Sequence, residues 1–215
     1  MTPPTTQAAP VKAPPERRYT KGARTKERIV DIALELFSQN GFHGVSIRDI
    51  AGAAGLSHTG VLLHIDNKDA LLIEVLRRRE ELEAEAQRAE RVGDGDIVGF
   101  VTRLVSRELV TPHLVALYVR MSSEATSPDH PAHAFFVDRY ERSRRWVSES
   151  LARYLELHPE TPAFDPDLVA VQAIALMDGL QVQWLLDPDA IDMGRAMLAW
   201  LATLGIHADE TDPPS

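Results

Sequence analysis

Residues 46–68, SIRDIAGAAGLSHTGVLLHIDNK, decide the fold, because their pattern predicts two short helices joined by a tight turn. Ser46 is a suitable N-cap, and Asp49 three residues later completes a capping-box pattern. Gly55 has no Cβ, so it suits the left-handed conformation that ends a helix and reverses the chain. Ser57 can then cap a second helix. The stretch is typical of a helix-turn-helix, whose second helix enters the major groove of DNA.

The second of these helices is predicted to have one face for packing and one face for DNA, because residues three and four apart share a face. The packing face carries Leu56, Val61 and Ile65. The outward face carries His58, Thr59 and Leu62. Asp66 or Asn67 can cap the next helix, so the second helix is expected to be about two turns long. A helix this short depends on its neighbours for stability.

Residues 28–57, RIVDIALELFSQNGFHGVSIRDIAGAAGLS, and the KDALL run from Lys68 place a preceding helix, a glycine turn and a following helix in one register. With this spacing, the stretch from Arg24 to Leu76 resembles the TetR family of transcriptional regulators. The resemblance implies an all-α fold, with an N-terminal three-helix DNA-binding domain followed by a helical domain for ligand binding and dimerisation.

The recognition segment departs from the common family pattern. Many members have an aromatic pair, as in L-Y-x-Y-F, where this chain has VLLHI from Val61 to Ile65. Leu62 replaces the tyrosine that often touches a phosphate in the family, so that contact is not carried over. Leu62 either meets a thymine methyl or simply packs. His64 and Lys68 match family positions, and a subgroup with L-S-H-x-G-x-L-x-H shares the departure, so we interpret it as a variant.

Polar residues in and beside the two short helices are candidates for DNA contact. Thr59 and His58 lie near the N-terminus of the recognition helix, where side chains reach base edges. Ser57, His64 and Lys68 are better placed for phosphates. The residues predicted to bind DNA are Arg24, Arg48, Ser57, His58, Thr59, Leu62, His64 and Lys68.

The charge of the chain is unevenly distributed. The net charge is −9, yet residues 1–68 hold nine lysines or arginines against six acidic residues, which leaves −12 on the remainder. An acidic body repels phosphate, so DNA is expected to bind only at the basic end. Within that end, Arg48 either contacts DNA or pairs with a carboxylate such as Asp49.

The composition, 44% hydrophobic and 26% charged, is that of an ordinary globular chain. The absence of cysteine excludes disulfides and thiolate metal sites. No apolar run is expected to reach the roughly 18 residues of a membrane span, and the N-terminus lacks the apolar core of a signal peptide. A cytoplasmic location is therefore expected.

Four segments are predicted along the chain. Residues 1–20 are rich in Pro, Thr and Ala and are expected to form a disordered basic arm, which either follows the DNA or is merely solvated. Residues 21–68 form the helix-turn-helix DNA-binding domain, residues 69–207 the helical regulatory and dimerisation domain, and residues 208–215 a flexible tail.

Helical periodicity extends through the rest of the sequence, with no sustained alternation of period two, so the predicted class is all-α. A helix is predicted over 25–40. A long helix from Lys68 carries the run RRREELEAEAQRAERV, whose charges are expected to lie on a solvated face. This helix would link the two domains as a rigid rod.

The body is expected to hold a ligand and to dimerise. Residues 167–186 and 192–204 are apolar on more than one face, which predicts a homodimer through these two segments. The TetR resemblance implies a small apolar ligand between the helices of the body. For each lining candidate core packing is the alternative, and these candidates are Phe100, Leu104, Leu117, Tyr118, Met121, Trp146, Met177, Gln181 and Trp184.

The sequence does not predict an enzyme. His130, His133 and Asp129 cluster in a Pro-rich loop, which gives metal ligands no rigid scaffold. No G-x-S-x-G, H-E-x-x-H or phosphate-binding glycine loop occurs, so neither metal nor cofactor is expected. The prediction is a DNA-binding regulator, a repressor that binds a palindromic operator as a homodimer and is released by a small ligand. The alternative is a helical protein-interaction module that does not bind DNA.

Overall fold

The computed structural model describes residues 21–89 and 96–207, so the predicted arm 1–20 and tail 208–215 lie outside the described residues. The described chain contains only helices as regular structure, which confirms the all-α prediction. The nine helices of these ranges are α1 (Lys21–Asn40), α2 (Ile47–Ala54), α3 (His58–Leu62), α4 (Lys68–Ala89), α5 (Ile97–Val110), α6 (Pro112–Glu124), α7 (His133–Leu157), α8 (Pro166–Leu186) and α9 (Met193–Thr203).

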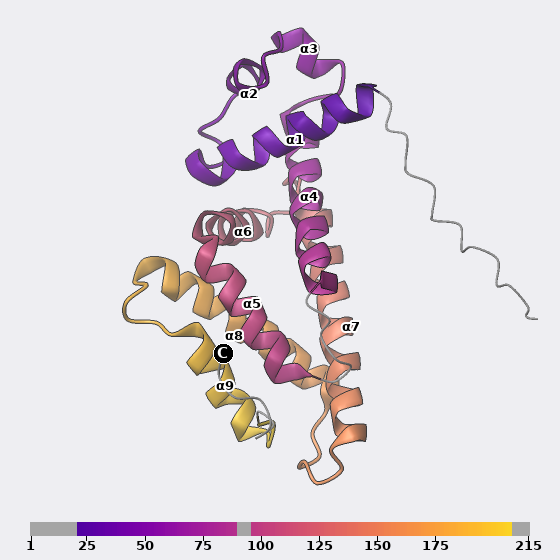
Figure 1. Cartoon of the computed structure of the whole chain (residues 1–215), viewed down its shortest axis with the longest axis vertical. Coiled ribbons are helices and arrows are strands. Elements are labelled where there is room, and N and C mark those ends of the chain that lie inside the picture. Colours follow the sequence, from indigo (N-terminus) through magenta and orange to yellow (C-terminus); the bar gives the residue numbers. More distant parts are fainter. Residues whose placement is uncertain (1–20, 90–95, 208–215) are drawn as a thin grey trace, which may run out of the picture.

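Helices α1, α2 and α3 form one end of the molecule, here called the head, and α5 to α9 form the body (Figure 1). Helix α4 leaves the head and runs into the body, as the rod expected from the sequence. Within the body, α7 packs along α8, and α9 packs against α5 and α8. The head contacts the rod through α1 on α4, and it contacts the body through α1 on α6.

Local capping defines the start of both short helices, as predicted. The Asp49 N–H donates to Ser46 Oγ over 3.2 Å, and the Ser46 N–H donates to the Asp49 carboxylate over 2.8 Å, which completes the capping box. Ser57 Oγ accepts from the Gly60 N–H over 3.0 Å at the start of α3. These hydrogen bonds satisfy N–H groups that have no partner within the helix.

The turn between α2 and α3 depends on Gly55, which has φ +63° in the left-handed region. Helix α3 then spans five residues, fewer than the two turns expected. It ends early because the chain turns again before Asn67, whose Oδ1 caps α4 by accepting from the Ala70 N–H over 2.8 Å.

Two glycines of the head give a matched test of this turn. Gly55→Ala is expected to lower the free energy of unfolding by about 1 kcal/mol, because a Cβ disfavours the left-handed conformation. Gly52 lies exposed inside α2, where an added Cβ meets nothing within 4 Å. Gly52→Ala should therefore raise stability by roughly 0.5–1 kcal/mol through helix propensity. Urea denaturation measures both changes, and equal effects of the two substitutions would contradict the role of Gly55.

Helix α1 braces the head. It begins at Lys21, earlier than the predicted start at residue 25. The Arg28 guanidinium donates to the backbone carbonyl of Ala54, at the C-terminal end of α2. Lys26 Nζ pairs with Glu74 over 2.9 Å and so ties α1 to α4. Helix α1 therefore fixes the position of the short helices relative to the rod.

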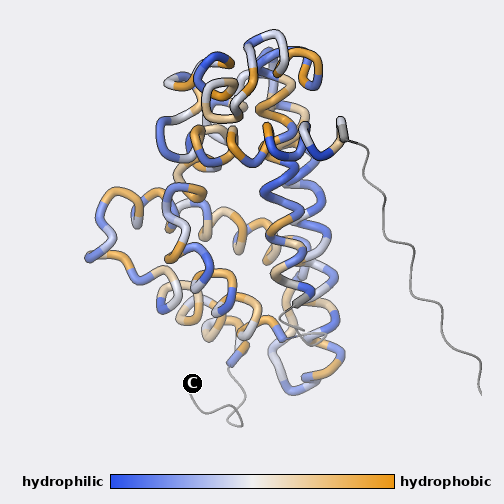
Figure 2. Tube along the Cα trace, turned by 45° about the horizontal axis from the view of Figure 1, so that its top comes forward, coloured by the Kyte–Doolittle hydropathy of each residue, from blue (hydrophilic) through white to orange (hydrophobic). Residues whose placement is uncertain are grey.

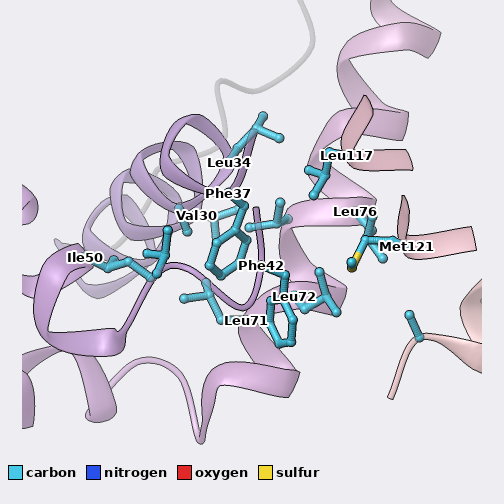
Figure 3. Packing of buried hydrophobic residues seen from close by; sticks show 14 of the residues in the cluster. Val30, Leu34, Phe37, Phe42, Ile50, Leu71, Leu72, Leu76, Leu117 and Met121 are labelled. Atoms are coloured by element: carbon cyan, nitrogen blue, oxygen red, sulfur yellow. The ribbon is translucent and has the colours of Figure 1, made fainter. Parts of the chain in front are cut away.

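The core of the head continues into the body. Figure 3 shows Phe37 and Phe42 packed near Leu71 and Leu72 of α4, with Leu76 reaching toward α6. Residues of α6 continue this core, among them Leu117 and Met121, which are both buried. Head, rod and α6 therefore share one hydrophobic core, so a displacement of α4 or α6 is felt in the head.

The charged run of α4 is not simply solvated, which corrects the sequence prediction. Figure 2 shows the hydrophilic stretch of this helix beside the body. Arg79 is only 5% exposed, and its guanidinium pairs with Glu83 over 2.9 Å. Glu80 pairs with Arg139 of α7 over 2.8 Å. Part of the run therefore faces inward because α7 supplies charged partners that the local sequence does not reveal.

Helix α8 is the most apolar helix of the body. An 18-residue stretch of α8 has a mean hydropathy of 1.4. By length and composition alone, this helix is long enough and apolar enough to cross a membrane. This corrects the expectation that no apolar run has that length. In the fold, α8 packs on α6, α7 and α9. Only 28% of the apolar stretch is buried in the single chain. Its apolar residues therefore serve both a core face and an outer face.

Candidate DNA interface and ligand cavity

The outer surface of the head is formed by the exposed face of α3. Val61 is fully buried and Ile65 is buried beside it, whereas His58 and Thr59 are exposed. The predicted division of α3 into a packing face and an outward face is therefore confirmed. Leu62 lies partly exposed next to the outward face, so its methyl groups are available to a partner.

A groove of about 480 Å³ runs between α2, α3 and the start of α4. Its wall brings together three residues of the predicted DNA-binding set: Arg48, His58 and Lys68. It also contains His43, which sequence reasoning missed because this residue lies in a loop with no periodic signal. Lys68 Nζ lies 4.4 Å from the centroid of the Phe42 ring, a cation–π contact that orients the amine. The groove thus presents basic and imidazole groups on one side of the head.

The acidic residue of the groove, Asp49, is occupied locally. Its carboxylate accepts hydrogen bonds from the side chain and the backbone of Ser46, and these bonds lower the pKa of Asp49. The alternative that Asp49 pairs with Arg48 is not observed in the described chain. Arg48 is exposed and keeps its charge available.

The other predicted DNA-binding residues do not line the groove. Ser57 Oγ serves as a cap acceptor, although its hydroxyl hydrogen remains a donor. His64 is half-buried beside Gly22 at the start of α1, and Arg24 is exposed on the same helix. The candidate DNA contacts therefore fall into three groups: the groove, the start of α1 with His64 beside it, and the exposed side of α3 with Ser57, Thr59 and Leu62.

The body contains a partly open cavity of about 890 Å³ among α4 to α9. Six of the predicted residues line it: Phe100, Leu104, Tyr118, Trp146, Met177 and Gln181. Three predictions were wrong, because Leu117, Met121 and Trp184 do not line the cavity. Leu117 and Met121 pack in the core that joins α6 to the head, and Trp184 packs in the core of the body.

Tyr118 connects the cavity to the rod. Two guanidinium groups lie over its ring, with the Cζ atoms of Arg79 and Arg139 at 3.8 Å and 4.7 Å from the ring centroid. Its hydroxyl donates to the Leu76 carbonyl of α4 over 2.8 Å. Burial raises the pKa of Tyr118 to about 12, so the hydroxyl stays a donor at neutral pH. Tyr118 therefore joins the wall of the cavity to α4.

Two carboxylates of the cavity wall have only neutral hydrogen-bond donors. Glu108 Oε1 accepts from Gln181 over 2.6 Å, and Asp178 accepts from the Tyr140 hydroxyl over 2.8 Å. Burial raises the pKa of Glu108 to about 7, and burial also raises the pKa of Asp178. The signal for Glu108 was present in the sequence, because it continues the buried face of α5 at helical spacing from Val105.

His130, in the loop before α7, and His133, the first residue of α7, form structural contacts. His133 Nδ1 lies 2.8 Å from the Ala125 carbonyl. Glu124 Oε2 lies 2.9 Å from His43 and 3.7 Å from His130, which links the head to the end of α6. Within residues 21–89 and 96–207 no group of three His, Cys, Asp or Glu side chains is arranged to hold a metal ion.

The structure combines a helix-turn-helix head, a helical rod and a body with a cavity. This combination is typical of the class of helix-turn-helix transcription regulators. Residues 29–75 match the family described as bacterial regulatory proteins, tetR family, and residues 95–205 match the BetI-type transcriptional repressor C-terminal family. The second match alone covers more than half of the chain. The chain belongs to the TetR family of transcriptional regulators, which is a family of DNA-binding proteins and not of enzymes.

Individual relatives support the same assignment. The regulator RutR of Escherichia coli K12 is 47% identical over 53 residues, a quarter of the length of either chain. The regulator AcrR of Shigella flexneri is 25% identical over 196 residues, which cover 84% of this chain and 87% of AcrR. A regulator from Saccharomonospora viridis, solved in complex with choline, superposes with a TM-score of 0.73 at 25% identity and covers 84% of this chain and 96% of its own.

Proposed function

We propose that this chain is a repressor that binds a palindromic operator as a homodimer and is released when a small ligand occupies the body cavity. The observation that carries the proposal is the direct contact between the cavity and the rod, through the Tyr118 hydroxyl and the Leu76 carbonyl. As a bacterial regulator of transcription it would act in the cytoplasm. In this proposal residues 21–68 read DNA and residues 69–207 bind the ligand and the second copy.

The proposed DNA contacts follow from the exposure of the head. His58 and Thr59 would reach base edges from the start of α3, with Leu62 against a thymine methyl. The remaining contacts would go to phosphates, from Arg24, Arg48, Ser57, His64 and Lys68. Two heads held by a dimer would enter successive major grooves roughly 34 Å apart, which gives the operator its two-fold symmetry.

The proposed dimer is supported by a stripe along the outer face of α8. Its members recur at spacings of three and four residues and are apolar or small: Leu168, Val171, Ala175, Gly179, Val182 and Leu186. Leu168 is 56% exposed and Val171 is 50% exposed, and they belong to one continuous stripe, which marks an interaction surface where single exposed apolar residues do not. The small residues at the centre allow two helices to approach closely. Helix α9 packs beside α8 and would complete a four-helix interface.

The proposed release mechanism is a shift between two conformations of the body. A ligand in the cavity would contact Tyr118 and Arg79, both of which bear on α4. Because the first turns of α4 form part of the head core, a tilt of α4 would move α3. Ligand binding would thus favour a dimer whose heads no longer match the spacing of the two half-sites.

The test is the salt dependence of DNA binding by the full chain. If several phosphates are contacted, the logarithm of the association constant falls against the logarithm of salt concentration with a slope of about −0.9 per phosphate. We expect a slope of −5 or steeper, on the order of six contacts per dimer, in fluorescence anisotropy with a selected duplex. A slope near zero would favour the alternative, a protein-interaction module that does not bind DNA. The net charge of −9 is the observation that supports this alternative.

A further inference from the structure

The cavity is long and has two unlike ends. Its α7 wall extends from Phe136 to Leu151, a rise of roughly 22 Å at the pitch of an α-helix. At one end the rings of Phe100 and Trp146 pack with centroids 4.4 Å apart. The other end holds the charged residues near α4 and α6. A volume of 890 Å³ is in the range of pockets for drug-sized ligands, well above the needs of choline with its seven heavy atoms.

The charges of the polar end do not balance locally. The three arginines of the cavity wall all have carboxylate partners: Arg79 with Glu83 at 2.9 Å, Arg139 with Glu80 at 2.8 Å, and Arg142 with Glu80 at 3.1 Å. Glu108 and Asp178 instead accept hydrogen bonds from neutral groups. Asp178 and Gln181 are neighbours on one face of α8, and Gln181 bonds Glu108, so the two carboxylates belong to one corner.

One atom of this corner lacks a partner. Glu108 is 95% buried, with 5% of its surface exposed, and its Oε2 is a buried acceptor without a hydrogen-bond donor in the structure. A buried carboxylate oxygen without a donor is costly and is usually explained by a missing partner. Arg79 Nε of the same cavity wall is also a buried polar atom without a hydrogen-bond partner. Glu108 lines the cavity, so a turn of its side chain would bring the unpaired oxygen to a ligand bound there.

We propose that the cavity binds an elongated organic amine in its protonated form, with the ammonium group between Glu108 and Asp178 and the apolar chain directed toward Phe100 and Trp146. The ammonium donates N–H bonds to both carboxylates, which a quaternary ammonium such as choline does not. The inference rests on the proposed ligand-responsive function and names the class of ligand that this function uses.

The proposal includes a dependence on pH. Burial raises the pKa of Glu108 to about 7. Three neighbours lower this pKa: Arg79 of α4, Gln181 of α8 and Arg139 of α7. The charge of Glu83 of α4 raises it further. Below that pH the carboxyl is protonated and must lose a proton to pair with an ammonium. The affinity is therefore expected to increase up to tenfold per pH unit between pH 5.5 and 7 and to level off above it. An alkylamine stays protonated throughout, because such groups titrate near 10.4.

Isothermal titration calorimetry of the full chain with four decyl compounds tests the proposal. We expect decylamine to bind at least tenfold more tightly than decyltrimethylammonium, decanol or decanoate at pH 8. Glu108→Gln should lower the affinity for decylamine at least tenfold and abolish its rise with pH, and Asp178→Asn should also weaken it. The control Glu149→Gln removes an exposed carboxylate of α7 and should change nothing.

Each outcome decides the matter. Equal binding of the four compounds, or an unchanged pH profile in Glu108→Gln, would overturn the proposal. Thermal unfolding shows whether the variants are folded; if Glu108→Gln is not, the compound series and the pH profile of the unaltered chain still decide. Operator binding is measured on the same preparation. DNA binding without amine binding overturns only this inference, whereas amine binding without DNA binding overturns the proposed function and leaves the cavity assignment standing.

Discussion

Replacing His58 and Thr59 together by alanine is expected to lower the affinity for the operator by about three orders of magnitude and to remove sequence selectivity. Each base contact is worth roughly 1–3 kcal/mol, and a dimer carries four of these side chains, so the loss is at least about 4 kcal/mol. Both side chains are exposed, so the fold should not change. Residual binding through phosphates should keep its dependence on salt.

Selection of bound duplexes from a random pool measures this effect directly. The unaltered chain should enrich a palindrome, and the double variant should enrich none. The matched control is Thr102→Ala with His113→Ala, which removes the same two side-chain types from exposed positions of the body. If the His58 and Thr59 variant selects the same palindrome with the same affinity, then α3 does not read the bases.

Replacing Leu168 and Val171 by arginine is expected to convert the dimer into monomers and to reduce operator binding with it. Both residues are exposed in the single chain, so the protomer tolerates the charges. In a two-fold interface each arginine occurs twice, and each would be buried without a partner at a cost of several kcal/mol. The dimer dissociation constant should rise at least about a thousandfold, since three powers of ten need only about 4 kcal/mol.

Analytical ultracentrifugation checks this expectation across protein concentration, together with operator affinity. Val137→Arg is the control, because Val137 is 54% exposed on α7 and lies outside the α8 stripe. The control should remain dimeric. A stripe variant that sediments as a dimer would assign the interface to another surface of the body.

The parts of the fold that sequence reasoning found are those determined by local chemistry. A serine before a helix, a glycine in the turn and an acidic residue three positions after the cap act within a few residues, so Ser46, Asp49 and Gly55 are readable in order. The packing face of α3 is readable for the same reason. The length of α3 was overestimated because a further turn, between Leu63 and the cap residue Asn67, ends the helix.

The cavity could be predicted only in part, because it depends on which buried side chains of a core also reach the cavity wall. Leu117 and Tyr118 are neighbours on α6, yet Leu117 packs into the head core and Tyr118 also reaches the cavity. Helical periodicity marks both as buried and cannot separate them. The charged wall was missed for a similar reason, since Glu80 and its partner Arg139 are 59 residues apart.

The shared core of head, rod and α6 limits how freely this regulator can be recombined with its relatives. A chimaera that joins a foreign head at residue 68 would separate Phe37 from Leu71 and Leu72, and one joined after Leu76 would still set new head residues against Leu117 and Met121. Substitutions on the two sides of this seam therefore have to be compatible with each other. An exchange of DNA specificity is easier by replacing the exposed residues of α3 alone, since these have no part in the seam.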